Sequence, residues 1–360
     1  MSASVTRTPW WAWAWPLLGW AVMAATFAVG ANNWLAALAA IVLIATVFAA
    51  VYHAEVIAER IGEPFGTLVL AVAVTVIEVA LIVSIMSAAP AEKAGLARDT
   101  VFATVMIACN GIVGICLLAG GVRHHTQGFH VEGASAALAV LAALTTLTLI
   151  LPNVVSTPGP VFSMSQLIFA GVISLILYGS YVFVQTVSHR GYFLPSKEDA
   201  ELGPHEPPST TIATVSAVLL LVSLVAVVGL AKALTPTLEV AVAYFAVPKA
   251  VVGVALALLV LMPEGLAAVR AARANQLQTS LNLALGSALA SIGLTIPTVA
   301  VVSIIMAQPL ELGLGHKDEV LLALTIVVGI ITLGTGRTTV LQGVVHLVIF
   351  AAFLFLALAP

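Results

Sequence analysis

The chain has 360 residues, of which 61% are hydrophobic and 8% are charged, and its net charge is −3. Soluble domains carry roughly 25% charged residues, so this composition excludes a soluble globular protein, and the charge argues against a nucleic-acid partner. Hydrophobic stretches of about 20 residues, each long enough to cross a bilayer, recur from end to end. The sequence therefore predicts an all-α polytopic membrane protein.

Eleven transmembrane helices are predicted from the hydrophobic stretches and the polar breaks between them. The first stretch has the look of a signal peptide, but the tryptophans that crowd its start are typical of an interfacial aromatic belt, which favours a retained span. The expected spans are residues 10–30, 33–58, 65–88, 100–121, 131–151, 163–188, 211–233, 244–270, 279–307, 318–335 and 338–359.

The distribution of Lys and Arg predicts the orientation. With the N-terminus in the cytoplasm, the inner segments hold eight of these residues and the outer segments hold five. Inner loops are normally richer in positive charge, so we expect the N-terminus inside and the C-terminus outside. The inner residues are Arg7, Arg60, Arg123, Arg190, Lys197, Arg270, Arg273 and Arg337.

A Pro/Gly-rich, charged loop near the middle of the chain divides the spans after the first into two sets of five. Because five is odd, two tandem five-helix units face opposite ways across the bilayer, as inverted repeats do in secondary transporters. The expected organisation is an N-terminal segment with the first helix, a first five-helix repeat, a cytoplasmic linker and a second five-helix repeat: residues 1–32, 33–188, 189–210 and 211–360.

Two acidic residues lie deep in the corresponding spans of these repeats. Glu78 interrupts the third span and Glu264 the eighth, although an acidic residue at the bilayer centre costs about 2.5–3.5 kcal/mol. No Lys or Arg lies at comparable depth, which leaves protons and metal cations as natural partners; the alternative is a neutral carboxyl buried in helix packing. Pro263 and Gly265 flank Glu264 and predict a broken helix whose carbonyls line a cavity.

Neutral oxygens accompany the two glutamates. Asn110 lies in the fourth span, and the ninth carries Asn282 beside a stripe of hydroxyls that includes Ser287 and Ser291. Thr75, one turn before Glu78, bonds either the carboxylate or its own helix. Ordinary small-residue packing is the alternative for the hydroxyls. Carboxylate, amide and hydroxyl oxygens suit a hard cation such as calcium, and burial favours the protonated carboxyl, so cation and proton compete.

Other polar residues have two open interpretations each. Glu63 is either a proton or cation relay or an acid favoured by a helix N-terminus. His346, inside the last span, is either a packing residue or part of the transport path. His124, His125 and His130 lie in a cytoplasmic loop and either sense pH or are simply solvated.

At these residues the chain resembles the calcium/proton antiporters of the calcium/cation exchanger superfamily, most closely the bacterial ChaA type. The resemblance implies one leading helix plus two inverted five-helix repeats, with cation binding by Glu78 and Glu264. Where many members have a Gly-Asn-Ala-Thr-Glu motif, this chain has "AVTVIE". The fragments that carry the resemblance are "HAEVIAERIGEPFGTLVL", "RDTVFATVMIACNGIVG", "MPEGLAAV", "NQLQTSLNLALGSALASIGLTIP" and "GTGRTTVLQGVVHL".

The resulting expectation is a secondary antiporter of the bacterial inner membrane, not an enzyme, which exports calcium in exchange for protons by alternating access. Its partners are calcium, protons and the lipid bilayer, and no cofactor is expected besides the transported cation. Sodium or potassium is the alternative substrate, because a site poor in amides suits a monovalent ion. An intramembrane hydrolase is a remote alternative, since Ser287 has no histidine in its own hairpin.

Overall fold

The structure is a computed structural model, and it describes residues 8–30, 32–62, 65–86, 94–155, 157–194, 207–244, 248–308 and 310–359. In these residues, ten helical stretches are long and apolar enough to cross a membrane. An eleventh helix, α12 (His316–Leu333), has 18 residues but carries Lys317, Asp318 and Glu319 in its first turn. The prediction of an all-α protein with about eleven membrane helices is confirmed.

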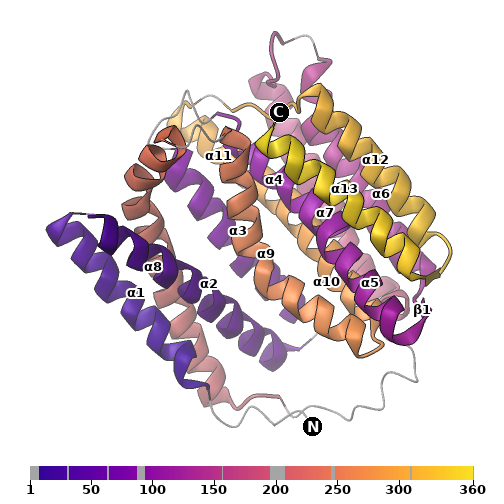
Figure 1. Ribbon diagram of the computed structural model, residues 1–360, viewed down its shortest axis with the longest axis horizontal. Helices are drawn as coiled ribbons and strands as arrows, with labels where there is room; N and C mark the ends of the chain where they lie inside the picture. The colour runs from indigo at the N-terminus through magenta and orange to yellow at the C-terminus, as the bar shows by residue number, and fades with distance from the viewer. Residues whose placement is uncertain are drawn as a thin grey trace. The chain divides into compact units, whose positions relative to one another are not determined.

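One compact unit contains four helices (Figure 1). Within it, α2 packs against the other three, and α8 also contacts α1 and α3. The four are α1 (Trp10–Val29), α2 (Asn33–Ile61), α3 (Phe65–Met86) and α8 (Thr210–Tyr244).

A buried histidine joins α1 to α2 in this unit. Pro16 lies inside α1, and because proline has no N–H, the carbonyl of Ala12 loses its helical donor. The Nε2 atom of His53, which is fully buried on α2, lies 2.8 Å from that carbonyl oxygen. His53 therefore supplies the hydrogen bond that Pro16 removes, and an internal proline is tolerated in the first span.

The second compact unit contains the remaining elements. Four of its long helices include a π-helical turn (η1, η2, η4 and η6), which the sequence did not predict, and η3 and η5 are short 3-10 helices. The elements are α4 (Leu96–Met106), η1 (Ile107–Ile112), α5 (Val113–His124), β1 (Gln127–Gly128), α6 (Val131–Thr145), η2 (Thr146–Ile150), η3 (Leu151–Asn153), α7 (Met164–Phe183), η4 (Val184–Ser188), η5 (Arg190–Tyr192), α9 (Lys249–Arg273), α10 (Leu277–Ala290), η6 (Ser291–Thr295), α11 (Ile296–Met306), α12, β2 (Arg337–Thr338) and α13 (Val340–Leu358).

Loops at one end of the second unit are tied together by hydrogen bonds. Strand β1 pairs antiparallel with β2. The buried Gln127 amide donates to the Ala272 carbonyl oxygen at 2.9 Å and to Asn275 Oδ1 at 3.0 Å. The β1–β2 ladder thereby contacts the turn between α9 and α10, and we call this the ladder end of the unit.

Loops at the opposite end are joined in the same way. The Glu311 N–H donates to the Ala94 carbonyl and the Leu314 N–H to the Leu149 carbonyl, at 3.0 and 2.8 Å. Asn153 Nδ2 donates to Glu319 Oε1 at 2.7 Å. We call this the acidic end, because Asp99, Glu311, Asp318 and Glu319 lie there.

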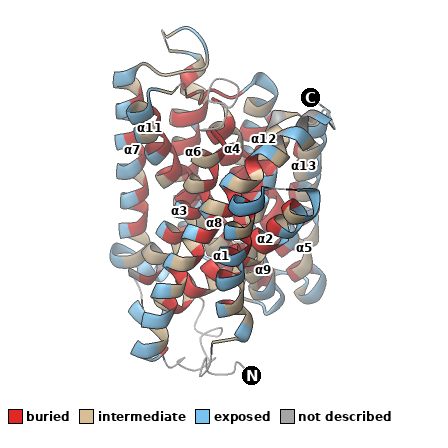
Figure 2. Cartoon of the chain, turned by 90° about the vertical axis from the view of Figure 1, so that its left-hand side faces the viewer, coloured by how far each residue is buried: buried red, intermediate tan, exposed pale blue. Residues whose placement is uncertain are grey.

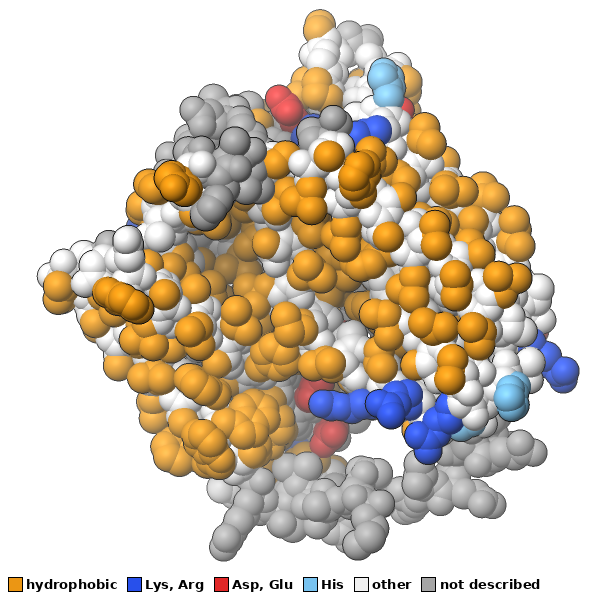
Figure 3. Space-filling model, in the orientation of Figure 1, with side chains coloured by type: hydrophobic (Ala, Val, Ile, Leu, Met, Phe, Trp, Pro, Cys, Tyr) orange, Lys and Arg blue, Asp and Glu red, His pale blue; other side chains and the backbone are white. Residues whose placement is uncertain are grey.

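Burial separates inner from outer helices in the second unit. Residues 100–114 are all buried, whereas α13 exposes one face (Figure 2). The outer faces of α12 and α13 present hydrophobic side chains such as Ile331, Val348 and Phe355, and Lys and Arg gather toward helix ends (Figure 3). Such a surface suits contact with lipid acyl chains.

The compact units do not follow the order of the sequence. Helix α8 comes after the linker but packs with α1, α2 and α3. It also extends to Tyr244, eleven residues beyond the predicted end at residue 233, with Pro236 inside it. The two predicted five-helix repeats concern the order of helices along the chain rather than these compact units, and they stay a prediction.

Candidate functional site

Glu78 lies on α3 in the first compact unit and is 2% exposed. The flanking Ile77 and Leu81 are also buried, as is Thr75, three residues earlier on the same helix. A carboxyl removed from water in this way needs a compensating partner or a proton. The residue is thus a candidate cation and proton ligand by its burial as well as by its charge.

Glu264 lies on α9 in the second compact unit and is 5% exposed. The predicted helix break beside it is wrong, because α9 is helical from Lys249 to Arg273 with Pro263 inside. Proline in a helix removes one hydrogen bond, and the packing of α9 along α4, α5 and α10 offsets that loss. The carbonyl of Leu259 still receives no bond from residue 263, since proline has no N–H.

The helix of Glu264 lies against the π segment η1. A Cβ atom on Gly265 would be 3.2 Å from Ile112 Cδ1, which is tighter than most side-chain contacts. The absence of a side chain at Gly265 therefore lets α9 approach η1 closely, next to the carboxylate.

Two π segments follow helices of the second unit: η1 begins eleven residues after the start of α4, and η6 begins fourteen residues after the start of α10. Asn110 lies in η1, and Ser291 is the first residue of η6. Helix α10 contacts η1, and α4 contacts η6. Single π turns inside α-helices are frequent at functional sites, so both segments are candidate parts of the transport path.

Asn110 is fully buried, and its amide is held by two other helices. Its Nδ2 donates to Thr325 Oγ1 on α12 at 2.9 Å, and its Oδ1 lies 3.0 Å from His346 Nδ1 on α13. The second ring nitrogen of His346 lies 3.2 Å from Thr332 Oγ1. The structure thus joins Asn110 to His346, which the sequence had not linked.

The predicted oxygens of α10 and η6 differ in their surroundings. Ser291 is buried and Ser287 is half-buried, so both remain candidate ligands. Asn282 donates through Nδ2 to the Phe193 carbonyl at 2.6 Å and accepts from Gln278 Nε2 at 3.0 Å. These bonds anchor the loop after α7, which gives Asn282 a structural role at the ladder end.

The remaining predicted residues are Glu63 and three loop histidines. Glu63 falls outside the described residues. His124 Nε2 lies 3.1 Å from the Arg273 carbonyl, and the His130 N–H donates to Gln278 Oε1 at 2.7 Å. His125 is exposed and has a positive φ of 64°. These loop histidines belong to the ladder end.

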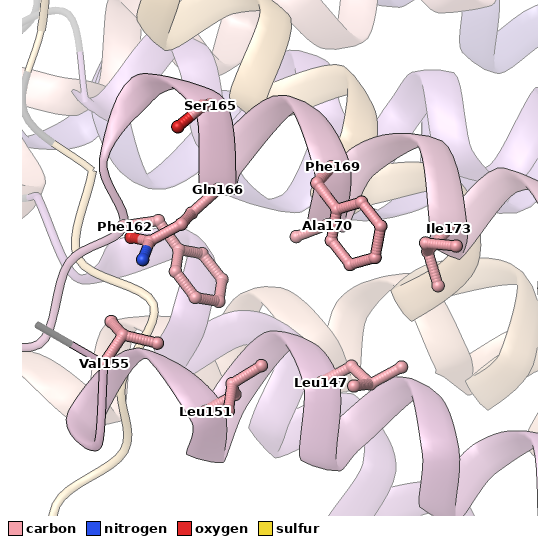
Figure 4. A pocket seen from close by; sticks show the side chains of 9 residues that line it. All are labelled: Leu147, Leu151, Val155, Phe162, Ser165, Gln166, Phe169, Ala170 and Ile173. Atoms are coloured by element: carbon pink, nitrogen blue, oxygen red, sulfur yellow. The ribbon is translucent and has the colours of Figure 1, made fainter.

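An apolar cavity of about 200 Å³ lies beside α7 (Figure 4). Figure 4 places side chains of α7 on one wall and of η2 and η3 on the other. None of its lining residues carries a charge, so the cavity does not suit cation binding. Its lining is Leu147, Leu151, Val155, Phe162, Ser165, Gln166, Phe169, Ala170 and Ile173.

Sequence reasoning missed the π segments and the partners of Asn110. Thr325 and Thr332 are common residues in membrane helices, and nothing in their spacing singles them out. His346 did carry a signal, since a polar side chain inside a membrane span normally has a specific partner. Only the fold identifies that partner.

The sequence profile of the family described as "Sodium/calcium exchanger protein" matches residues 32–187 and 215–359. The chain is 49% identical to a protein of Sinorhizobium fredii described as "Putative ionic transporter y4hA", over 98% of this chain and 97% of the relative. It is 36% identical to ChaA of Escherichia coli, a sodium-potassium/proton antiporter, over 88% of this chain and 87% of that protein.

Solved structures share the fold. Native YfkE superimposes with a TM-score of 0.72 and 17% identity, covering 97% of this chain and 100% of YfkE. The H+/Ca2+ exchanger CAX does so with a TM-score of 0.70 and 14% identity, covering 94% of this chain and 87% of CAX. The predicted resemblance to the cation exchangers is confirmed. The chain is a secondary transporter rather than an enzyme, and it belongs to the sodium/calcium exchanger protein family.

Proposed function

We propose that the protein exchanges a cation for protons and that Glu78 and Glu264 bind both in turn. The observation that carries this proposal is the burial of both carboxyls in apolar helices, at 2% and 5% exposure. A buried carboxylate is stable only when it is paired or protonated. Alternation between a cation and a proton meets that requirement throughout a transport cycle.

Calcium is the proposed cation. Two ionised carboxylates balance the charge of a divalent cation, and calcium accepts six to eight oxygen ligands in irregular geometry. The hydroxyls of Thr75, Ser287 and Ser291 are proposed as additional ligands. Structural neighbours described as a Ca2+/H+ antiporter, YfkE, and an H+/Ca2+ exchanger, CAX, share the fold, which is compatible with this substrate.

Sodium or potassium is the second candidate. ChaA, at 36% identity, is named a sodium-potassium/proton antiporter. The stretch "AVTVIE" before Glu78 has no amide, and the amides of Asn110 and Asn282 are bonded to protein groups. A site with few neutral oxygen ligands favours a monovalent ion, because such an ion loses less hydration energy that the ligands must replace.

Inverted repeats over residues 33–188 and 211–360 remain part of the proposal. The two stretches that match the family profile are residues 32–187 and 215–359. The occurrence of a π segment between α4 and α5 and of another between α10 and α11 also supports it. Glu78 and Glu264 then occupy corresponding helices of opposite orientation, as in other transporters built from inverted repeats.

Proton-coupled flux in proteoliposomes tests the proposal. Calcium, sodium and potassium are supplied separately while a pH-sensitive dye inside the vesicles reports proton movement. We expect E78Q and E264Q each to lower exchange at least 100-fold. The control is E132Q at an exposed glutamate in the first turn of α6, which keeps the wild-type rate. Exchange that survives both buried substitutions contradicts the proposal, and the cation that drives proton movement decides between the two candidates.

A further inference from the structure

We propose that His346 is a positioning residue for transport: it fixes the orientation of the Asn110 amide and, through η1, the place of the Glu264 segment of α9. The inference rests on the proposed role of Glu264. The contacts involved all lie within the second compact unit.

The directions of the hydrogen bonds follow from the groups present. The Thr325 hydroxyl donates to the Leu321 carbonyl of its own helix at 2.7 Å, so its oxygen accepts from Asn110 Nδ2 at 2.9 Å. The other amide atom, Oδ1, is only an acceptor. His346 Nδ1 must therefore carry the proton that it shares with Oδ1 over 3.0 Å.

The second ring nitrogen completes the arrangement. In a neutral imidazole with its proton on Nδ1, Nε2 is an acceptor, so the Thr332 hydroxyl donates to it at 3.2 Å. Both helices of the α12–α13 hairpin are thus attached to η1 at one point.

The polar groups of this network are buried, so each of them needs a hydrogen-bond partner within the protein. Asn110 is fully buried, His346 is 1% exposed, and Thr325 and Thr332 are each 2% exposed. Removing one partner of a buried hydrogen bond leaves the other unsatisfied, which costs more than the bond contributes. Loss of the His346 donor is expected to move the Asn110 amide and the non-standard backbone around it.

Two close contacts make this region sensitive to small shifts. A Cβ atom on Gly114 would be 3.2 Å from His346 Cβ, so α13 approaches α5 closely. On the other side, Ile112 of η1 lies against Gly265, beside Glu264. A displacement of η1 is therefore passed to the carboxylate-bearing turn of α9 with little slack between them.

Substitutions at His346 separate positioning from packing. Asn places its side-chain NH2 where Nδ1 lies, whereas Gln places it where Nε2 lies. We expect H346L and H346Q to raise the half-saturating concentration of the transported cation about tenfold, by the cost of one unsatisfied buried group, while the maximal rate stays within about twofold. H346N is expected to stay within about twofold of wild type in both quantities.

A space-filling role predicts the reverse order, because Gln is closer to His in volume than Asn is. We further expect H346L combined with N110A to be no weaker than N110A alone, since both remove one interaction. The control is T148V, which removes a buried hydroxyl bonded to the Leu144 carbonyl of the same chain segment and leaves the half-saturating concentration unchanged.

The measurements use the full-length protein in proteoliposomes after size-exclusion chromatography has confirmed a monodisperse sample. Should H346L fail to fold, the comparison of H346N with H346Q decides the matter alone. The inference is overturned by an H346N that is as weak as H346Q, or by effects of H346L and N110A that multiply. Failure of the proposed function is a separate result, namely exchange that persists in E264Q.

Discussion

At the scale of single residues, the chemistry of Glu78 and Glu264 predicts how transport depends on pH. A carboxyl that holds a proton cannot bind a cation, so lowering the pH raises the half-saturating cation concentration while the maximal rate is retained. By linkage, the logarithm of that concentration changes with pH by about −1 for each proton displaced. Two competing glutamates predict a limiting slope of about −2.

Initial rates of flux over a series of cation concentrations and pH values measure this slope. A slope near −2 supports both carboxyls as shared sites for cation and protons. A half-saturating concentration that does not change with pH would show that protons and cations do not compete. The measurement also bears on the substrate, because displacement of two protons matches the charge of one calcium ion.

The two glutamates were predictable because the sequence marks them directly. A charged residue within a run of about 20 apolar residues is easily recognised. Because its burial in a membrane costs free energy, such a residue normally has a function. The bonds of Asn110 were not predictable, because its partners Thr325 and His346 lie more than 200 residues away in the chain. Such partners depend on tertiary packing, which spacing along one helix does not reveal.

At the scale of elements, Pro263 and the π segments reverse the expectation from local sequence. Pro263 and Gly265, on either side of Glu264, predicted a break in α9, yet the helix continues and the irregular backbone lies in η1 and η6 instead. Proline removes one backbone hydrogen bond from the helix. The packing contacts along the 25 residues of α9 stabilise the helix by more than this loss. A π turn has no strong sequence signature, so its position follows from packing.

The contact between α9 and η1 can be tested with two glycines. G265A places a Cβ atom 3.2 Å from Ile112 Cδ1, so the Ile112 side chain of η1 must give way by a few tenths of an ångström. We expect about a threefold or greater increase in the half-saturating cation concentration, since this contact is next to Glu264 and small misplacements in a site are costly.

The matched control is G286A on α10, where an added Cβ meets no atom within 4 Å. Alanine favours a helix over glycine by about 1 kcal/mol, so this variant should transport normally and be at least as thermostable as wild type. Flux assays and thermal unfolding in detergent measure both effects. Equal behaviour of the two variants would contradict a functional contact between α9 and η1.

At the scale of the whole molecule, charge separates the two ends of the second compact unit. Arg123, Arg190, Arg270, Arg273 and Arg337 belong to segments at the ladder end. Among the described residues, the segments at the acidic end hold three basic residues, Arg98, Lys249 and Lys317, together with the four acidic residues named above. The positive-inside rule therefore predicts that the ladder end lies in the cytoplasm.

The number of helices and this charge asymmetry were predictable from sequence, because membrane thickness sets the length of a span and loop charges can be counted. The composition of the compact units was not. Helix α8 packs with α1, α2 and α3 across more than 120 residues of intervening sequence. Its apolar letters do not specify which helices it contacts, since each of them is apolar as well.

Cysteine labelling tests the orientation. The starting protein carries C109A and C116A, which replace two buried, free cysteines. T126C then places an exposed thiol at the ladder end, and H316C does so at the acidic end, where the His316 side chain is fully exposed. In intact bacterial cells a membrane-impermeant maleimide should label H316C and spare T126C, and permeabilisation should make T126C reactive. Labelling of T126C in intact cells would contradict the predicted orientation, because it would show that the ladder end, with its arginines and histidines, lies outside the cell.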